Sequence, residues 1–244
     1  MITIGIFAYN EELNLRQTVE TVMYAAHLAH DTPLEIIIVN DGSTDHTEQV
    51  IADLKTEHPA IRSITHERNT GIGTTIKDIV NAATCDKICF IPGDNIFTLY
   101  TLKTILLSAS KADIVLHYHI NSEVRKKGRI FLSVLFTFIY KFTFHLQLIY
   151  VNGLGIYPTA TLRAIPIRSK RYNIAAEINV KTLLRGHSYY EMGGYMNPLA
   201  QKSSALTVSN FFDVAISFLK LCYEVKVTHR DIYSKQPVRV IDSI

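Results

Sequence analysis

The sequence predicts an α/β fold, a mostly parallel sheet with helices on both faces. Short β-rich runs alternate with amphipathic segments at the spacing of strand–helix–strand units, and this pattern repeats four times in the first half. Of 244 residues, 48% are hydrophobic and 19% charged. A chain this apolar can bury a full core, which excludes a disordered or collagen-like protein.

The first half supplies the regular elements. Strands are expected over residues 2–8, 35–40, 61–66, 87–91 and 113–117, with helices near 14–29, 45–57, 74–83 and 98–110. The second half is less regular. It holds a segment rich in Phe, Leu, Ile and Tyr over 130–151, a Gly-Gly pair at 193–194, and expected helices near 174–186 and 206–222. The tail from about Ser234 is short and polar and is expected to fray.

Composition narrows the class of protein. A net charge of +3 is too small to indicate nucleic-acid binding. Three cysteines without a paired framework indicate a reducing compartment. The amino terminus has no basic region before its apolar run, so no signal peptide is expected, and no stretch reaches 18 uninterrupted apolar residues. These features predict a cytoplasmic protein built as one domain over 1–244.

Four polar segments follow the first four expected strands. They are Tyr-Asn-Glu-Glu at 9–12, Asn-Asp-Gly-Ser-Thr-Asp at 40–45, Asn-Thr-Gly-Ile-Gly at 69–73 and Pro-Gly-Asp-Asn at 92–95. Each segment alone is typical of a turn or a helix start. Ligands bind open parallel sheets outside the carboxyl ends of the strands, so four such segments on one rim predict a nucleotide site. A dinucleotide oxidoreductase is disfavoured because the first strand–helix turn lacks a glycine cluster.

These ordered motifs resemble the family 2 glycosyltransferases of GT-A fold, a Rossmann-like architecture, and most closely the dolichol- or polyprenyl-phosphate sugar synthases. The resemblance covers about residues 1–195 and is sharpest over 1–97. It implies that residues 1–120 bind a UDP- or GDP-linked sugar and that 121–244 face the acceptor and the membrane. It also implies inverting transfer of a hexosyl or N-acetylhexosaminyl group to a polyprenyl or dolichyl phosphate. The donor-binding residues that it indicates are Ala8, Tyr9, Glu11, Asp41 and Gly71.

The resemblance further implies a Mg²⁺ or Mn²⁺ site on the donor diphosphate. The family's acidic motif aligns with 92–95, where Pro92 replaces the first Asp and leaves Asp94 as the only carboxylate. Asp94 and Asn95 are the expected metal ligands, with Asp94 catalytic through the metal. One carboxylate suffices in principle, because Mg²⁺ accepts waters and phosphate oxygens for its other positions. A later family signature that contacts the diphosphate keeps only Lys202 and Ser203 here.

From Arg129 onward, polar residues recur every four positions beside a broad apolar face. This pattern fits either a core helix with a wet edge or a helix lying in the membrane interface beside the basic run 125–129. The resemblance implies that Arg129 and Ser133 contact the acceptor phosphate. Arginine suits this task because its planar fork binds phosphate bidentately.

Glu177 matches a glutamate that the family keeps, either as a catalytic base or as a helix residue that orders the site. A lipid phosphate is already anionic and needs no base, whereas a sugar hydroxyl does. The alternatives are therefore a transferase that acts on a glycan hydroxyl, and a nucleotide-sugar-binding pseudoenzyme subunit, which the departures at Pro92 and 197–204 suggest. The expected association with the membrane is peripheral or through a membrane-protein partner.

Overall fold

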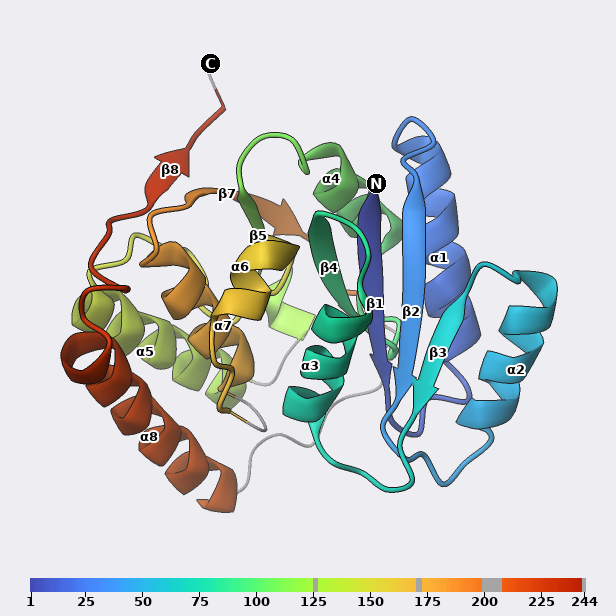
Figure 1. Cartoon of the computed structure of the whole chain (residues 1–244), viewed down its shortest axis with the longest axis horizontal. Coiled ribbons are helices and arrows are strands. Elements are labelled where there is room, and N and C mark those ends of the chain that lie inside the picture. The colour runs from blue at the N-terminus through green and yellow to red at the C-terminus, as the bar shows by residue number, and fades with distance from the viewer. Residues whose placement is uncertain (125–126, 170–172, 199–207, 243–244) are drawn as a thin grey trace.

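The computed structural model describes residues 1–124, 127–169, 173–198 and 208–242. Its centre is an eight-stranded sheet with the order β3-β2-β1-β4-β6-β5-β7-β8 (Figure 1). β6 pairs antiparallel with β4 and β5, and every other pairing in the sheet is parallel. The carboxyl ends of β1 to β5 therefore lie at one edge of the sheet, the lower edge in Figure 1.

The first half confirms the expected strands and helices. In chain order they are β1 Ile2–Ala8, α1 Leu15–Leu28, β2 Leu34–Asn40, α2 Thr47–Glu57, β3 Arg62–Thr65, α3 Ile72–Ala82, β4 Lys87–Pro92, α4 Leu99–Leu107 and β5 Ile114–His119. Local sequence explains several boundaries. Thr98 caps α4 by accepting a hydrogen bond from the backbone N–H of Thr101, and α3 starts after Gly71, whose φ of +91° favours glycine.

The second half contains strands that the sequence did not reveal. After a 3₁₀ turn at Ser122–Val124 come α5 Lys127–Phe144, β6 Ile156–Pro158, α6 Thr159–Ala164, α7 Ile174–Leu183, β7 Ser188–Gly194, α8 Val208–Tyr223, a π-helical turn Glu224–Thr228 and β8 Val238–Val240. The expectation of a frayed tail is wrong, because β8 pairs with β7 and Lys111 binds Asp242 at 2.5 Å. β6 fits beside β5 because Gly155 has no side chain: a Cβ there would lie 2.0 Å from the Val115 carbonyl oxygen.

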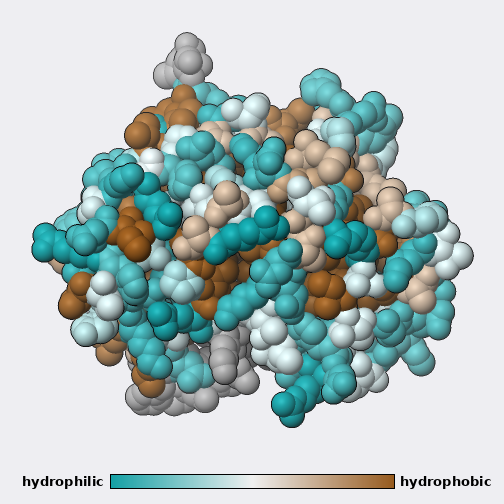
Figure 2. Space-filling model, viewed as in Figure 1, coloured by the Kyte–Doolittle hydropathy of each residue, from teal (hydrophilic) through white to brown (hydrophobic). Residues whose placement is uncertain are grey.

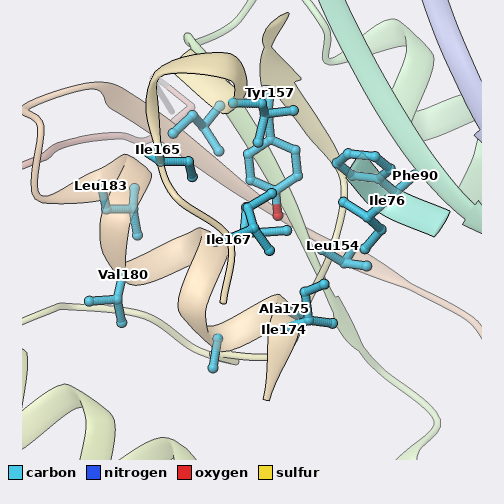
Figure 3. Packing of buried hydrophobic residues seen from close by; sticks show 14 of the residues in the cluster. Ile76, Phe90, Leu154, Tyr157, Ile165, Ile167, Ile174, Ala175, Val180 and Leu183 are labelled. Atoms are coloured by element: carbon cyan, nitrogen blue, oxygen red, sulfur yellow. The ribbon is translucent and has the colours of Figure 1, made fainter. Parts of the chain in front are cut away.

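Helices cover both faces of the sheet. α1, α2 and α4 pack on one face against alternate residues of β1, including Ile2, Ile4 and Ile6. α3, α6 and α7 cover the other face (Figure 1). On this second face Tyr157 lies between Phe90 and the residues of α7, which packs its apolar side chains toward the sheet (Figure 3). This packing fixes the sheet edge that carries the polar loops.

α5 presents most of its apolar residues to solvent. Of its side chains, those of Thr137, Tyr140 and Phe144 are buried, and Tyr140 packs against Phe218 of α8 with 4.9 Å between ring centroids. The exposed apolar residues of α5 are Phe131, Leu132, Val134, Leu135, Phe138, Ile139 and Phe142, with exposures of 39% to 75%. The core-helix interpretation is therefore wrong. The first polar residues of the four-residue repeat that starts at Arg129 turn toward the protein, whereas the apolar face of the helix is exposed.

α8 also exposes apolar residues, namely Ile216, Leu219 and Tyr223, and Val227 is exposed just beyond the helix. Hydrophobic atoms reach the surface along the edge formed by α8 (Figure 2). Within the described ranges, none of the helices combines the length and apolar content needed to cross a membrane.

Candidate functional site

The loops after β1 and β2 are joined into one rim by reciprocal hydrogen bonds. The backbone N–H of Asn10 donates to Ser43 Oγ at 2.9 Å, and Asn10 Oδ1 accepts from the N–H of Thr44 at 2.8 Å. The N–H of Glu12 donates to Asp45 at 3.2 Å, while the Glu12 carboxylate accepts from the His46 N–H at 2.8 Å. Because these bonds run in both directions, the two loops hold each other in place.

The expected donor residues at the start of this rim differ in access. Ala8 is buried at the end of β1, and its carbonyl accepts from the N–H of Asp41 at 2.9 Å. Tyr9 is 45% exposed and leads into Asn10, whose φ is +56°. Glu11 is half-buried, and its N–H donates to Thr47 Oγ1 at 2.8 Å. The structure thus leaves Tyr9 available to a ligand and makes Ala8 a backbone support.

The carboxylate of Asp41 accepts hydrogen bonds from groups of the protein itself. Its Oδ1 accepts from the N–H and hydroxyl of Thr70, both at 2.8 Å, and from His66 at 2.8 Å, while Oδ2 accepts from the Gly71 N–H at 2.8 Å. Burial alone would raise the pKa of Asp41, but the bonds from His66, Thr70 and Gly71 outweigh it and lower that pKa. Asp41 therefore fixes the loop that carries Gly71.

The loop after β2 approaches the loop after β3 very closely. Gly42 has a φ of +68°, and a Cβ there would lie 2.3 Å from the backbone carbonyl carbon of Arg68. Only glycine fits such a contact, so this residue sets the distance between the two loops.

Asp94 and Asn95 lie in a tight turn anchored to β1 and α1. The N–H of Gly93 donates to the Phe7 carbonyl at 2.9 Å, and the N–H of Asn95 donates to Thr18 Oγ1 at 3.0 Å. Asn95 has a φ of +54°, a conformation that asparagine tolerates better than most residues. Burial raises the pKa of the Asp94 carboxyl, and the positive charge of Arg129 opposes that rise.

Four charged groups from distant segments lie near one another here: Glu11, Asp45, Asp94 and Arg129. Burial raises the pKa of Glu11, Asn14 opposes the rise, and the negative charges of Asp94 and Asp45 add to it. By contrast, the positive charge of Arg129 in α5 lowers the pKa of Asp94. The structure therefore brings the expected donor residues Glu11 and Asp94 together with the expected acceptor residue Arg129. Ser133, one turn further along α5, is also partly buried on the inward side.

This arrangement fits a divalent cation held largely by a ligand's phosphates. The described part of the chain contains no cluster of three or more His, Cys, Asp or Glu side chains able to hold a metal ion. However, burial raises the pKa of both Asp94 and Glu11, and the negative charge of Asp94 raises that of Glu11 further, so a bound cation would stabilise both carboxylates. The protein donors offered here are oxygens, which Mg²⁺ and Mn²⁺ prefer.

The segment 196–198 docks on this turn. Asn197 donates from Nδ2 to the Asn95 carbonyl at 3.2 Å and from its N–H to the Ile96 carbonyl at 2.7 Å. Met196 exchanges two hydrogen bonds with the side chain of Asn121, which follows β5. The expected diphosphate residues Lys202 and Ser203 come shortly after this segment and lie outside the described residues.

Glu177 is held in a buried ion-pair network. Its Oε1 lies 2.6 Å from the ammonium of Lys181, which is fully buried and also lies 2.9 Å from Glu224. The N–H groups of Arg168 and Ser169 donate to the two oxygens of Glu177 at 2.9 and 2.7 Å. Burial alone would raise the pKa of Glu177, but Lys181 and these donors lower it. This geometry favours an ordering role over a base, and the i,i+4 spacing of Glu177 and Lys181 was the sequence signal for it.

A cavity of about 1100 Å³ borders this network. It lies between α7 and α8 and is lined in part by Arg168, Glu177 and Lys220. None of the expected donor residues that the structure describes lines it, whereas the polar rim carries Ala8, Tyr9, Glu11, Asp41 and Gly71, so the rim is the candidate nucleotide site.

Sequence reasoning missed His66 and Asp78. His66 follows β3, and its two ring nitrogens lie 2.8 Å from Asp41 and 2.8 Å from Asp78 of α3. The signal was a histidine at a strand's carboxyl end, but its partners are 25 and 12 residues away, and only the fold brings them together.

Comparison with known proteins identifies the family. The profile of glycosyl transferase family 2 matches residues 3–164. A dolichyl-phosphate beta-glucosyltransferase of Trichomonas vaginalis is 35% identical over 79 residues, which are 31% of this chain and 23% of that protein. An uncharacterized glycosyltransferase of Nostoc sp. is 28% identical over 114 residues, 47% of this chain and 34% of that protein. The matches thus span about a quarter and about a third of the length of these two curated relatives.

Solved structures share the fold. Glucosyl-3-phosphoglycerate synthase of Mycobacterium tuberculosis, solved with Mn²⁺, UDP-glucose and phosphoglyceric acid, superposes with a TM-score of 0.63 at 16% identity, over 91% of this chain and 79% of that one. S. aureus TarS superposes with a TM-score of 0.59 at 19% identity, over 92% of this chain and 39% of that one. The family profile covers about two thirds of the sequence, including all four polar segments of the rim, and the chain belongs to glycosyl transferase family 2.

Proposed function

We propose that this chain transfers a sugar, with inversion, from a UDP- or GDP-linked donor to a polyprenyl or dolichyl phosphate at the cytoplasmic face of a membrane. The observation that carries the proposal is that Arg129 lies near enough to Asp94 for its positive charge to lower the pKa of that carboxyl. It joins an arginine suited to an acceptor phosphate with the carboxylate suited to the donor diphosphate. The partial match to a dolichyl-phosphate glucosyltransferase supports the same acceptor class.

The donor end of the site follows from the rim. Tyr9 is exposed beside the joined loops and can stack on a base or ribose. Asp94 and Asn95, with Glu11 nearby, would hold Mg²⁺ or Mn²⁺ against the diphosphate. The bound metal would neutralise charge that develops on the leaving nucleoside diphosphate.

The acceptor end needs orientation more than proton transfer. The phosphate of a lipid monophosphate is already anionic near neutral pH. Arg129 can bind this phosphate bidentately, and the hydroxyl of Ser133 can donate a hydrogen bond to it, so that one phosphate oxygen faces the anomeric carbon. That oxygen forms the new bond as the nucleoside diphosphate leaves from the opposite side, and no proton has to move. The burial of Glu177 in its ion pairs is consistent with a reaction that uses no carboxylate base.

The exposed apolar face of α5 and α8 supports a peripheral position on the bilayer. Phe131, Phe138 and Phe142 share one side of α5, and α8 carries exposed apolar residues of its own. Lys141 and Lys226 add positive charge around this surface. Aromatic and aliphatic groups edged by lysine are typical of helices that lie in the headgroup region.

A transfer assay tests the proposal. The protein is mixed with UDP- or GDP-sugars, a short polyprenyl phosphate and Mn²⁺ or Mg²⁺, with EDTA as control. Parallel reactions contain a glycan hydroxyl acceptor or phosphoglycerate. A metal-dependent lipid-phosphate sugar formed from one donor is the expected product.

Two other outcomes would contradict different parts of the proposed function. Transfer only to the hydroxyl acceptor or to phosphoglycerate overturns the acceptor class. Donor binding without transfer to any acceptor favours the pseudoenzyme, which the Pro92 departure suggests.

A further inference from the structure

His66 connects three segments of the donor rim. It follows β3, its N–H donates to the Asn40 carbonyl at 2.9 Å, and its side chain is 12% exposed. Nδ1 lies 2.8 Å from Asp41 Oδ1, and Nε2 lies 2.8 Å from Asp78 Oδ2 on α3. The ring therefore spans from the end of β2 to the helix that starts at the rim.

The proton count of this arrangement is fixed by its hydrogen bonds. An ionised carboxylate can only accept, so each ring nitrogen must donate to satisfy its partner. A neutral imidazole carries one N–H and can satisfy only one of the two carboxylates. Both contacts are made together only by the doubly protonated ring, the imidazolium.

The charges around the ring favour that form. The charged groups that act on His66 are Asp41 from the loop after β2 and Asp78 from α3, and the Thr70 hydroxyl lies 3.0 Å from Nδ1. Burial alone would lower the pKa of His66, but the bonds and charges of the two carboxylates outweigh it and raise that pKa. Asp41 in turn accepts from Thr70 and Gly71, so the ring helps fix the start of α3.

We infer that His66 is a positioning residue for the donor: as an imidazolium bridging Asp41 and Asp78, it holds the 66–71 loop in the shape that receives the nucleotide. The inference rests on the proposed function, since it assigns this rim to the nucleotide. Loss of the ring proton leaves a lone pair facing one carboxylate. The bridge then opens, and Asp41 loses a partner that fixes it. Nucleotide affinity should therefore fall as the pH rises through the pKa of His66.

The test combines NMR of the histidine ring with nucleotide binding across pH, using UDP and GDP with Mn²⁺. The variants are Asp78→Asn, whose side chain is partly exposed on α3, and His66→Gln, which cannot titrate. Asp53→Asn on α2 is the matched control, an exposed helical carboxylate far from the ring.

We expect the wild-type His66 ring to titrate above the ordinary value of about 6.5. Nucleotide affinity should weaken by about tenfold above that pKa, the loss expected for one charge-assisted hydrogen bond. Asp78→Asn should move both transitions to lower pH, and Asp53→Asn should move neither. His66→Gln should bind at every pH with the weaker affinity that the wild type shows above the pKa of His66, so its binding should have no transition.

Each contrary result is decisive. A wild-type ring that titrates at or below the ordinary value, or affinity that does not follow the ring's pKa, overturns the inference and leaves the proposed function intact. Absence of nucleotide binding at every pH overturns the proposed function and the donor role together. In that case the ring titration and the exchange protection of the Thr70 and Gly71 amides still show whether the bridge exists.

Discussion

Arg129 lies within electrostatic range of Asp94, and its positive charge lowers the pKa of a carboxyl that burial raises. The two residues come from different halves of the chain, Asp94 from the turn after β4 and Arg129 from the first turn of α5. An acceptor phosphate bound at Arg129 would therefore lie beside a donor diphosphate held at Asp94.

Replacing Arg129 by Ala should raise the KM for lipid phosphate by at least about tenfold, because a charge-assisted, bidentate contact is lost. At saturating metal, the KM for the donor should change far less. Arg129→Lys should recover only part of the loss, since a lysine cannot bind bidentately. Lys127→Ala, an exposed cation on the same helix, is the control. Steady-state kinetics in both substrates checks this, and equal changes in the two KM values would make Arg129 structural.

Asp94→Asn should weaken Mn²⁺-dependent donor binding by at least about tenfold. Even the loss of a group that only hydrogen-bonds a metal ligand costs about tenfold or more in metal affinity, and Asp94 is itself the expected ligand. Titration calorimetry with and without EDTA measures the difference. Asp86→Asn is the matched control, because Asp86 is an exposed carboxylate directly before β4, at the opposite edge of the sheet. Donor affinity that depends on Mn²⁺ equally in both variants would falsify the metal assignment.

Glu177→Gln should reduce the free energy of unfolding by about 3–5 kcal/mol, the usual cost of breaking a buried ion pair from one side. The reason is that Lys181 is fully buried and would keep only Glu224 as a counter-charge. Urea denaturation measures the change. Adding Lys181→Met, which removes the uncompensated charge, should recover part of the stability. A stable Glu177→Gln protein whose kcat falls by orders of magnitude would instead identify Glu177 as a base.

The sequence predicted the first half of the fold because its signals are local. Four of the five expected strands read as short apolar runs, β3 with its Arg-Ser-Ile-Thr being the exception, and the helices between them have one buried face. The second half was harder for a physical reason. β6 has three residues and β8 three, too few to show a periodicity, and β7 begins with Ser-Tyr-Tyr-Glu, which alternates weakly.

The rim was predictable because it depends on topology, whereas its internal contacts were not. Asp94 and Glu11 had to meet at the carboxyl edge once the strands were parallel. The partners of Asp41 are His66, Thr70 and Gly71, and nothing in their spacing indicates which of them bond. In α5 the periodic pattern correctly predicted a helix, but periodicity does not say which face of the helix turns toward the protein. That choice is made by the contacts of Tyr140 and Phe144 with α8.

The combined change of Phe131, Phe138 and Phe142 to Ser should abolish most binding to lipid vesicles. These rings are 64–75% exposed, so folding gains little from them, whereas burial in a bilayer would stabilise each by about 1.5–3 kcal/mol. Sedimentation with neutral and anionic vesicles measures binding, and urea denaturation should show unchanged stability. Replacing Tyr24 and Leu107, exposed on α1 and α4, is the control. Vesicle binding that is unchanged, or lost equally in the control, would remove α5 from the membrane contact.

Glu35 should make folding stability depend on pH between neutrality and acid. Its side chain is 8% exposed and accepts from Thr3 Oγ1 at 2.5 Å, Arg62 Nη1 at 2.6 Å and the N–H of Thr84 at 2.9 Å. Burial alone would raise the pKa of Glu35, but these bonds lower it below the unfolded value of about 4.5. A carboxyl whose folded pKa is lowered stabilises the protein above the unfolded pKa, and that contribution is lost as the pH falls through the folded pKa.

Glu35→Gln should therefore cost on the order of 1–3 kcal/mol at pH 7, the worth of a hydrogen bond to a charged group. The difference from the wild type should shrink as the pH falls below about 4.5, because protonation removes the same charge from the wild type. Urea denaturation across this range measures both curves. Glu57→Gln, which removes a surface partner of Arg16, should stay close to the wild type throughout. A Glu35→Gln deficit that is constant with pH would mean that packing around Thr3 and Thr84, and not the carboxylate charge, supplies the stability at this end of the sheet.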